Sequence, residues 1–217
     1  MKTLLVATDF SYAASNAADY AAEMAVAINA DILLLHVYQI PVVYLEVPVA
    51  TNETDMILDA EKSMGQLKDK LTNKTGSKLH IESEIRVGLF FGELQAVCER
   101  VRPYAVVMGS QGTTAAERFF LGGHAVYAMK HLTWPLITVS PEAKFSAIKK
   151  IGLACDFDNV VETMPVDEIK TLVNDFHAEL HILNTGKQRT YNPEIVFESG
   201  MLRNMLKDIQ TDYHFKL

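Results

Sequence analysis

Two groups of residues in this sequence are of types that could bind a phosphorylated ligand. The first is a glycine-rich segment, Gly109-x2-Gly112-x9-Gly122, which continues into Gly123 and His124. Glycines let a ligand approach the backbone closely, and the N-terminus of a helix offers unpaired N–H donors to a phosphate. The second is Asp9, whose carboxylate could accept hydrogen bonds from ribose hydroxyls or from an adenine amine. Together they indicate a nucleotide site.

Each group also has a purely structural interpretation. Glycines after a strand often only make a turn, and Asp9 could merely cap a helix. The sequence contains neither GxxxxGK[ST] nor GxGxxG, so hydrolysis by a P-loop enzyme is unsupported. From these residues alone, phosphate binding and a simple turn both stay open.

The strands and helices that position these residues are predicted by an alternation of apolar runs and amphipathic segments. We expect strands at 4–7, 32–37, 81–87, 105–108 and 136–139, and helices at 14–28, 56–71, 94–101 and 125–132. This β–α alternation implies a doubly wound α/β domain with a parallel sheet, ending near Ser140. Asp9 ends the first strand and Gly109 follows the fourth. They face one crevice if those strands are neighbours where the strand order reverses.

The pattern then restarts. The segment 4–11 reappears as 151–158, an offset of 147 (151 − 4), and the segment 30–37 reappears as 178–185, an offset of 148 (178 − 30). We therefore expect a tandem arrangement with domains at 1–142 and 148–217. Counterparts of the fourth strand, the glycine loop and the fifth strand are missing, so we expect the second unit to be partial, either truncated or degenerate.

Several other reactive side chains fit a structural role better than a chemical one. We interpret His36 as a hydrogen-bonded, partly buried imidazole and Cys98 as a core residue. Cys155 takes the place of Thr8 near the crevice, where packing is favoured over a reactive thiol. We expect Met56 and Met64 to belong to the core stripe of a helix.

Two further patterns are ambiguous. His177, Glu179 and His181 have a metal-like spacing, but they straddle a helix end and a strand, so we expect no metal site there. The segment 38–49 contains a mostly apolar run, 42–47, between Pro41 and Pro48, and it is either a flap over the crevice or a contact for another subunit.

Composition narrows the class of protein. The 217 residues include 20 Lys and Arg against 27 Asp and Glu, a net charge of −7, which argues against a nucleic-acid surface. No stretch approaches the ~20 apolar residues that span a bilayer, and the N-terminal apolar run is too short for a signal peptide. With only two cysteines, we expect a cytoplasmic protein without a membrane partner.

The chain resembles the universal stress proteins. The resemblance rests on Thr8-Asp9-Phe10-Ser11, His36-Val37, the glycine spacing, Arg118-Phe119-Phe120-Leu121-Gly122 and Trp134-Pro135-Leu136-Ile137-Thr138-Val139. It implies a five-stranded parallel sheet in the order 3-2-1-4-5, an adenine-nucleotide α-hydrolase-like fold. Many family members dimerise through strand 5, and tandem members carry two units in one chain. One branch of the family binds ATP and another binds no nucleotide.

The resemblance also implies a set of binding residues. By motif position, Ala7, Thr8, Asp9 and Val37 would surround adenosine, and Met108, Gly109, Gly112, Gly122, Gly123, His124 and Ala125 would line the phosphates. ATP-binding members have Ser or Thr where this chain has Gly123. The lost hydroxyl removes a hydrogen bond to a charged group worth about 1.5–3 kcal/mol, or roughly 10- to 150-fold in affinity.

From this resemblance we expect a stress-response regulator that binds ATP, and Mg²⁺ with it, in its N-terminal domain. We expect slow ATPase activity at most, because the sequence shows no nucleophile, general base or metal cluster that indicates catalytic turnover. The expected partners are the adenine nucleotide and a second copy of the chain, or else an intrachain pseudo-dimer. The alternative is a universal stress protein without nucleotide that acts as a dimeric interaction module.

Overall fold

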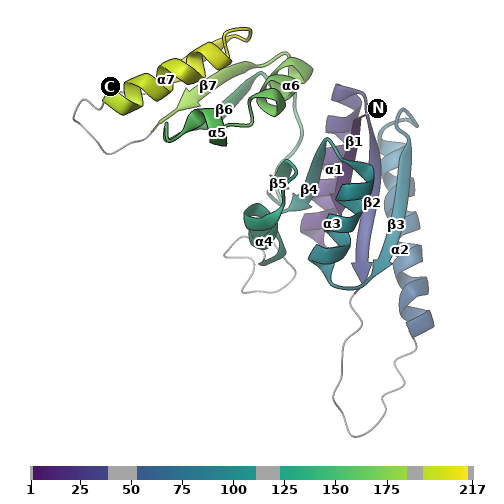
Figure 1. Ribbon diagram of the computed structural model, residues 1–217. Coiled ribbons are helices and arrows are strands. Elements are labelled where there is room, and N and C mark those ends of the chain that lie inside the picture. The colour runs from purple at the N-terminus through teal and green to yellow at the C-terminus, as the bar shows by residue number, and fades with distance from the viewer. Residues whose placement is uncertain (1, 39–52, 111–122, 185–192, 215–217) are drawn as a thin grey trace, which may run out of the picture. The chain divides into compact units, whose positions relative to one another are not determined.

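The computed structural model describes residues 2–38, 53–110, 123–184 and 193–214 (Figure 1). The chain divides into two compact units, Met1–Phe145 and Ser146–Leu217, which are called unit 1 and unit 2 below. Both units place parallel strands beside helices, as the β–α alternation of the sequence predicts.

Unit 1 is built on a five-stranded parallel sheet in the order β3-β2-β1-β4-β5 (Figure 1). Its strands are β1 (Lys2–Ala7), β2 (Ala30–Tyr38), β3 (Ile81–Val87), β4 (Ala105–Gly109) and β5 (Leu136–Val139). The strand order reverses between β1 and β4, which pair directly with Leu4 opposite Ala105. The predicted fold class and strand order are therefore confirmed.

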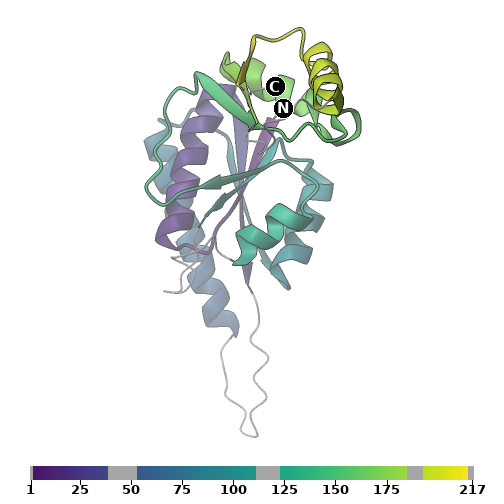
Figure 2. The same ribbon diagram turned by 90° about the vertical axis from the view of Figure 1, so that its left-hand side faces the viewer.

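Helices lie on both sides of this sheet (Figure 2). They are α1 (Tyr12–Ile28), α2 (Glu53–Lys74), α3 (Phe90–Val101) and α4 (Gly123–His131). One core cluster joins the sheet to α3 and α4 through buried residues that include Leu5, Leu35 and Leu94. Trp134, the only tryptophan of the chain, packs against this cluster.

Helix α1 begins and ends as its sequence predicts. The Ser11 side chain caps its start by accepting a hydrogen bond from the Ala14 N–H, and Asn29 ends it in a left-handed conformation with φ 52°. The buried face consists mostly of alanines, seven of them between Ala13 and Ala25. Small side chains let the helix backbone lie close to the sheet, where it contacts β1, β2, β4 and β5.

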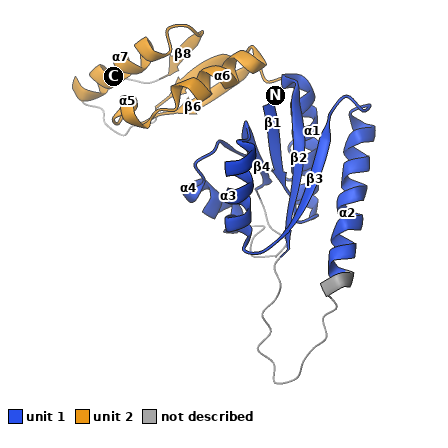
Figure 3. Ribbon diagram, turned by 45° about the vertical axis from the view of Figure 1, so that its right-hand side comes forward, with its two compact units in different colours: residues 1–145 blue, residues 146–217 orange. Residues whose placement is uncertain are grey.

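Unit 2, drawn in orange in Figure 3, is built on a three-stranded parallel sheet in the order β6-β7-β8. Its elements are β6 (Lys150–Ala154), α5 (Val160–Thr163), α6 (Val166–Phe176), β7 (Glu179–Leu183), α7 (Pro193–Met205) and β8 (Thr211–His214). Between β6 and β7 two helices stand where unit 1 has the single helix α1. Pro165 is the N-cap of α6, and a proline inside a helix would remove a backbone hydrogen bond and clash with the preceding turn.

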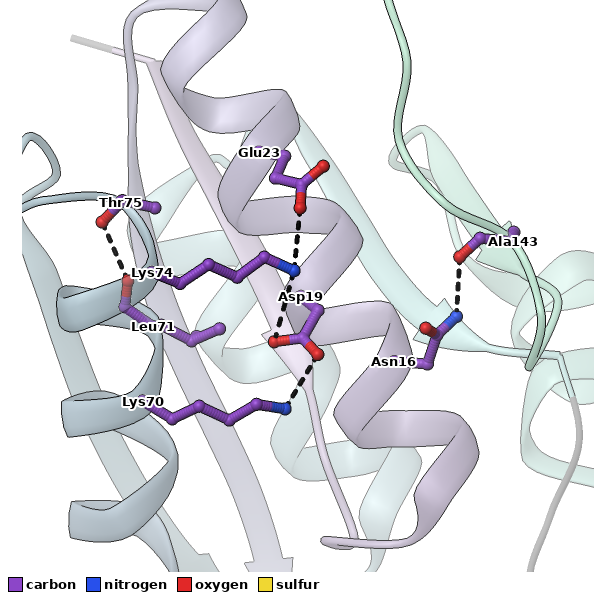
Figure 4. A network of polar contacts seen from close by, with 8 residues as sticks. All are labelled: Asn16, Asp19, Glu23, Lys70, Leu71, Lys74, Thr75 and Ala143. Atoms are coloured by element: carbon purple, nitrogen blue, oxygen red, sulfur yellow. Dashed lines mark hydrogen bonds and ion pairs between the residues drawn. The ribbon is translucent and has the colours of Figure 1, made fainter.

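Polar contacts join α1 to α2 in unit 1 (Figure 4). Lys70 Nζ lies 2.8 Å from Asp19 Oδ2, and Lys74 Nζ lies 2.8 Å from Glu23 Oε1. Asn16 Nδ2 donates to the carbonyl oxygens of Ser140 and Ala143, both at 3.0 Å. These contacts hold α2 and the chain after β5 against the outer side of α1.

The apolar stripe of α2 differs from the prediction at one position. Met64 is 3% exposed and belongs to the core as expected. Met56 is 38% exposed, so its assignment to the core was wrong. Its sulfur instead accepts a hydrogen bond from the Tyr38 hydroxyl at 2.8 Å, near the end of β2.

Within the described parts of the chain, the helices are all too short or too polar to cross a bilayer.

Candidate functional site

The loop after β1 is held in place by its own short-range hydrogen bonds. The Thr8 N–H donates to the Leu35 carbonyl oxygen at 2.9 Å, and Thr8 Oγ1 accepts from the Phe10 N–H at 3.0 Å. Asp9 Oδ1 accepts from the Ser11 N–H at 3.0 Å, and the Asp9 side chain is exposed. Phe10 adopts a left-handed backbone with φ 62°. The loop therefore presents a carboxylate to solvent from a fixed backbone.

His36 ties β2 to the same loop. Its Nδ1 lies 2.8 Å from the carbonyl oxygen of Thr8, and its ring packs on Phe10 with the ring centroids 4.6 Å apart. A carbonyl oxygen can only accept a hydrogen bond, so Nδ1 must carry the proton. The expected role of His36 as a hydrogen-bonded, partly buried imidazole is confirmed.

Gly109 brings the end of β4 into direct contact with the start of α1. A Cβ atom at this position would lie 2.9 Å from the Ala13 carbonyl carbon, 3.0 Å from its oxygen and 3.1 Å from the Ala14 nitrogen. Any side chain here would displace backbone, so only glycine allows this approach. Ala13 lies in the first turn of α1, four residues after Asp9. Gly109 at the end of β4 and the Asp9 loop after β1 thus lie at the carboxyl ends of two neighbouring strands, at the same edge of the sheet.

The first turn of α4 provides the other described part of the predicted phosphate segment. A Cβ added to Gly123 would have no atom of the described residues within 4 Å. The exposed His124 stacks its ring on Phe90 of α3, with the ring centroids 4.6 Å apart. Sequence reasoning missed Phe90, although it lies only three residues after the predicted third strand. Gly112 and Gly122, like the apolar segment 39–49, lie outside the described residues.

Four of the predicted site residues turn their side chains into the core. Ala7, Met108 and Ala125 are 5%, 6% and 2% exposed, and Val37 is partly buried against the same cluster as Met108. These residues can offer a ligand little more than backbone groups and the edge of an apolar wall.

Unit 2 repeats the local geometry of the Asp9 loop. The Cys155 N–H donates to the Leu183 carbonyl oxygen at 3.0 Å, and the Phe157 N–H donates to Cys155 Sγ at 3.3 Å. Phe157 has φ 60°, and the Asp158 N–H donates to Asp156 Oδ1 at 3.2 Å. In the place of His36, Asn184 Nδ2 donates to the Cys155 carbonyl oxygen at 2.7 Å. Different side chains therefore hold the two loops in one shape.

Both cysteines are buried, in keeping with the packing role predicted for them. Cys155 is 8% exposed, and burial raises the pKa of its thiol. Burial, with a smaller effect from the Glu99 carboxylate, raises the pKa of Cys98 to about 12. Because the thiolate is the nucleophile, neither residue is placed to react.

The chain is similar in sequence and in fold to known proteins. A universal stress protein of Methanocaldococcus jannaschii is 28% identical over 148 residues, which cover 66% of this chain and 84% of that protein. The crystal structure of a universal stress protein in complex with cAMP covers 64% of this chain and 96% of its own, at 22% identity and a TM-score of 0.50. A universal stress protein structure from Archaeoglobus fulgidus covers 98% of this chain and 75% of its own, at 16% identity and a TM-score of 0.69.

The structural matches have low sequence identity and establish the fold. The family is established by sequence, because the sequence model of the universal stress protein family matches residues 1–140, which include β1 to β5 and the whole candidate site. The chain therefore belongs to the universal stress protein family.

Proposed function

We propose that unit 1 binds an adenine nucleotide, with ATP as the primary ligand, at the edge of the sheet where β1 and β4 end. The observation that carries the proposal is the backbone contact of Gly109 with the first turn of α1. This contact brings Gly109, the last residue of β4, beside the loop that presents Asp9. In open α/β sheets, ligands bind outside the carboxyl ends of the strands where the strand order reverses.

The residues divide between the two halves of the ligand. Thr8, Asp9 and Val37 would contact the nucleoside, with the Asp9 carboxylate accepting hydrogen bonds from ribose hydroxyls. The phosphates would lie along the segment from Gly109 to Ala125, where the N–H groups at the start of α4 and the helix dipole favour negative charge. Mg²⁺ would arrive with the nucleotide.

We assign this site to regulation and not to turnover. None of the described site residues is held against a partner in the way that a nucleophile is held against its general base. Slow hydrolysis is the most that we expect. A universal stress protein crystallised with cAMP makes cyclic and linear adenine nucleotides the ligands to compare first.

We further propose that unit 2 is a partial second copy of the universal stress protein fold, with domains at 1–142 and 148–217. The matching hydrogen bonds of the Asp9 and Asp156 loops support a tandem origin. Self-association, either between chains or as an intrachain pseudo-dimer, and a cytoplasmic location complete the proposal.

Calorimetric titration of the full chain with Mg²⁺-ATP tests the nucleotide site. Asp9→Ala removes the proposed ribose acceptor and should weaken binding about 10-fold or more, the value of a hydrogen bond to a charged group. Asp156→Ala is the matched control, because it removes the same local backbone hydrogen bond in unit 2 and should leave affinity unchanged.

Each outcome bears on a separate part of the proposal. If both substitutions changed the affinity for ATP equally, the ligand would not bind at the Asp9 loop. No heat and no thermal shift at millimolar ATP, AMP and cAMP would reject nucleotide binding and leave the interaction module as the function.

A further inference from the structure

One face of the unit 2 sheet carries a cluster of polar side chains. Along β7, Leu180 and Ile182 are fully buried in the unit 2 core, so His181 between them points to the opposite face. His181 is the register partner of Asp212 on β8, and His214 follows two residues later on the same face. The parallel register therefore places two imidazoles and one carboxylate together from segments about thirty residues apart.

The ligand atoms of these three side chains lie close enough to share one ion. One nitrogen or oxygen from each of His181, Asp212 and His214 lies within 4.8 Å of the other two. His181 Nδ1 is 2.8 Å from His214 Nε2 and 3.9 Å from Asp212 Oδ2. Ligand atoms about 2.1 Å from a tetrahedral zinc ion lie about 3.4 Å apart. Small side-chain adjustments would therefore convert the cluster into a coordination site.

A second carboxylate, that of Glu179, lies beside the other ring nitrogen of His181. Its Nε2 is buried and forms no hydrogen bond among the described residues, but it lies 3.5 Å from Glu179 Oε2. A proton on Nε2 would face Glu179 and leave the Nδ1 lone pair directed at Asp212 and His214. Metal-binding histidines characteristically direct their second nitrogen toward a carboxylate in this way.

We propose that His181, Asp212 and His214 bind a divalent transition-metal ion of the zinc class, with a fourth position left to water or an outside ligand. Imidazole suits zinc, copper, iron and nickel, and two imidazoles with one carboxylate form a recognised open zinc site. The ion would clamp β7 to β8. The competing explanation is a metal-free pair of stacked imidazoles sharing one hydrogen bond, with ring centroids 5.1 Å apart.

Zinc titration of the full, untagged chain separates these explanations. The protein is stripped of metal with a chelator and titrated with Zn²⁺ against a chromophoric zinc indicator. We expect one equivalent to bind. His181→Asn and His214→Asn should each weaken this binding more than 100-fold. Glu179→Gln should weaken it about 10-fold, the lower end of the cost of losing an outer carboxylate partner.

His177→Asn is the matched control. This histidine is exposed, lies outside the cluster and has φ 50°, a conformation that asparagine tolerates. Its replacement should leave zinc affinity unchanged. Failure to bind one equivalent, or equal affinity in wild type, His181→Asn and His214→Asn, would overturn the proposal.

A stability measurement provides a second readout that does not depend on the indicator. Far-UV circular dichroism should show that Zn²⁺ raises the unfolding temperature of unit 2 in the wild type but not in His214→Asn. Trp134 belongs to unit 1, so its fluorescence follows the unfolding of that unit beside the circular dichroism signal. If His181→Asn does not fold, the variant His214→Asn tests the site by itself, because His214 is exposed. A rise of the unfolding temperature with Zn²⁺ that persists in His214→Asn would refute the site.

Discussion

Adding one carbon atom at Gly109 tests the contact that brings the end of β4 to α1. In Gly109→Ala the new Cβ would lie 2.9 Å from the Ala13 carbonyl carbon, whereas unstrained carbon contacts lie near 3.5–4.0 Å. The atoms that it meets are all backbone, so no change of side-chain rotamer can relieve the clash. We expect a loss of about 1–3 kcal/mol in the free energy of unfolding, the usual cost of forcing extra carbon into a packed site.

Gly65→Ala provides the matched control, since it makes the same chemical change in the middle of α2. A Cβ there would have nothing within 4 Å, and alanine is favoured over glycine inside a helix by about 0.5–1 kcal/mol. The two substitutions should therefore change stability in opposite directions.

Thermal unfolding followed by Trp134 fluorescence reports on unit 1 alone, because the single tryptophan packs in its core. At about 4 °C per kcal/mol for a domain of this size, Gly109→Ala should lower the transition by roughly 4–12 °C. Gly65→Ala should raise it by roughly 2–4 °C. A Gly109→Ala protein that unfolds at the wild-type temperature would show that β4 and α1 do not meet as described, and would remove the main support for the nucleotide site.

Three further predictions test single groups. Gly123→Ser should tighten ATP binding roughly 10- to 150-fold in calorimetry, while Gly123→Ala should not. Neither side chain would meet an atom of the described residues within 4 Å of its Cβ, and only serine adds a hydroxyl. Equal affinities of the two variants would show that the hydroxyl is irrelevant. His36→Ala should lower the free energy of unfolding in urea by about 1 kcal/mol, because it removes the hydrogen bond to the Thr8 carbonyl oxygen. His36→Asn should lower it less, because an asparagine makes the equivalent contact in unit 2. A larger loss for His36→Asn than for His36→Ala would contradict this interpretation. Burial raises the pKa of Cys98 to about 12 and also raises the pKa of Cys155. At pH 8 a thiol reagent should therefore label neither cysteine in the native chain and both cysteines in guanidinium. Rapid labelling of Cys155 in the native chain would show that its thiol is accessible.

Strands were the easiest elements to predict because their residue patterns depend only on burial. The alternating run at 81–87 coincides with β3, and the unbroken run at 4–7 lies within β1. The alternation of strands and helices predicted a parallel sheet, and β1 does run parallel to its neighbour β2. The strand order came from the family resemblance, since local sequence does not specify which strands become neighbours.

Contacts between distant segments were beyond sequence reasoning. His181 was considered with His177 and Glu179, its neighbours in sequence, but the parallel register brings it to Asp212 and His214. The pairing of His124 with Phe90 depends in the same way on how α4 lies beside α3. Sequence spacing describes one element at a time, whereas these contacts depend on the packing of two.

At the candidate site, sequence predicted the residue types better than their orientation. Asp9 is exposed at the end of β1 as expected, and Gly109 is required by a close backbone approach. Met108 and Ala125, which the resemblance assigns to the phosphate site, are instead buried in the core.

The hydrogen bonds of the Asp9 loop have a consequence for the kinetics of ligand binding. The Thr8 N–H, the Thr8 carbonyl and the Phe10 N–H are all bonded within the protein, to Leu35, to His36 and to the Thr8 side chain. The conformational entropy of this segment is therefore lost during folding and not during association. The Asp9 loop is therefore preorganised for a ligand. The association rate constant at this loop should be limited by diffusional encounter and not by a preceding rearrangement of the loop.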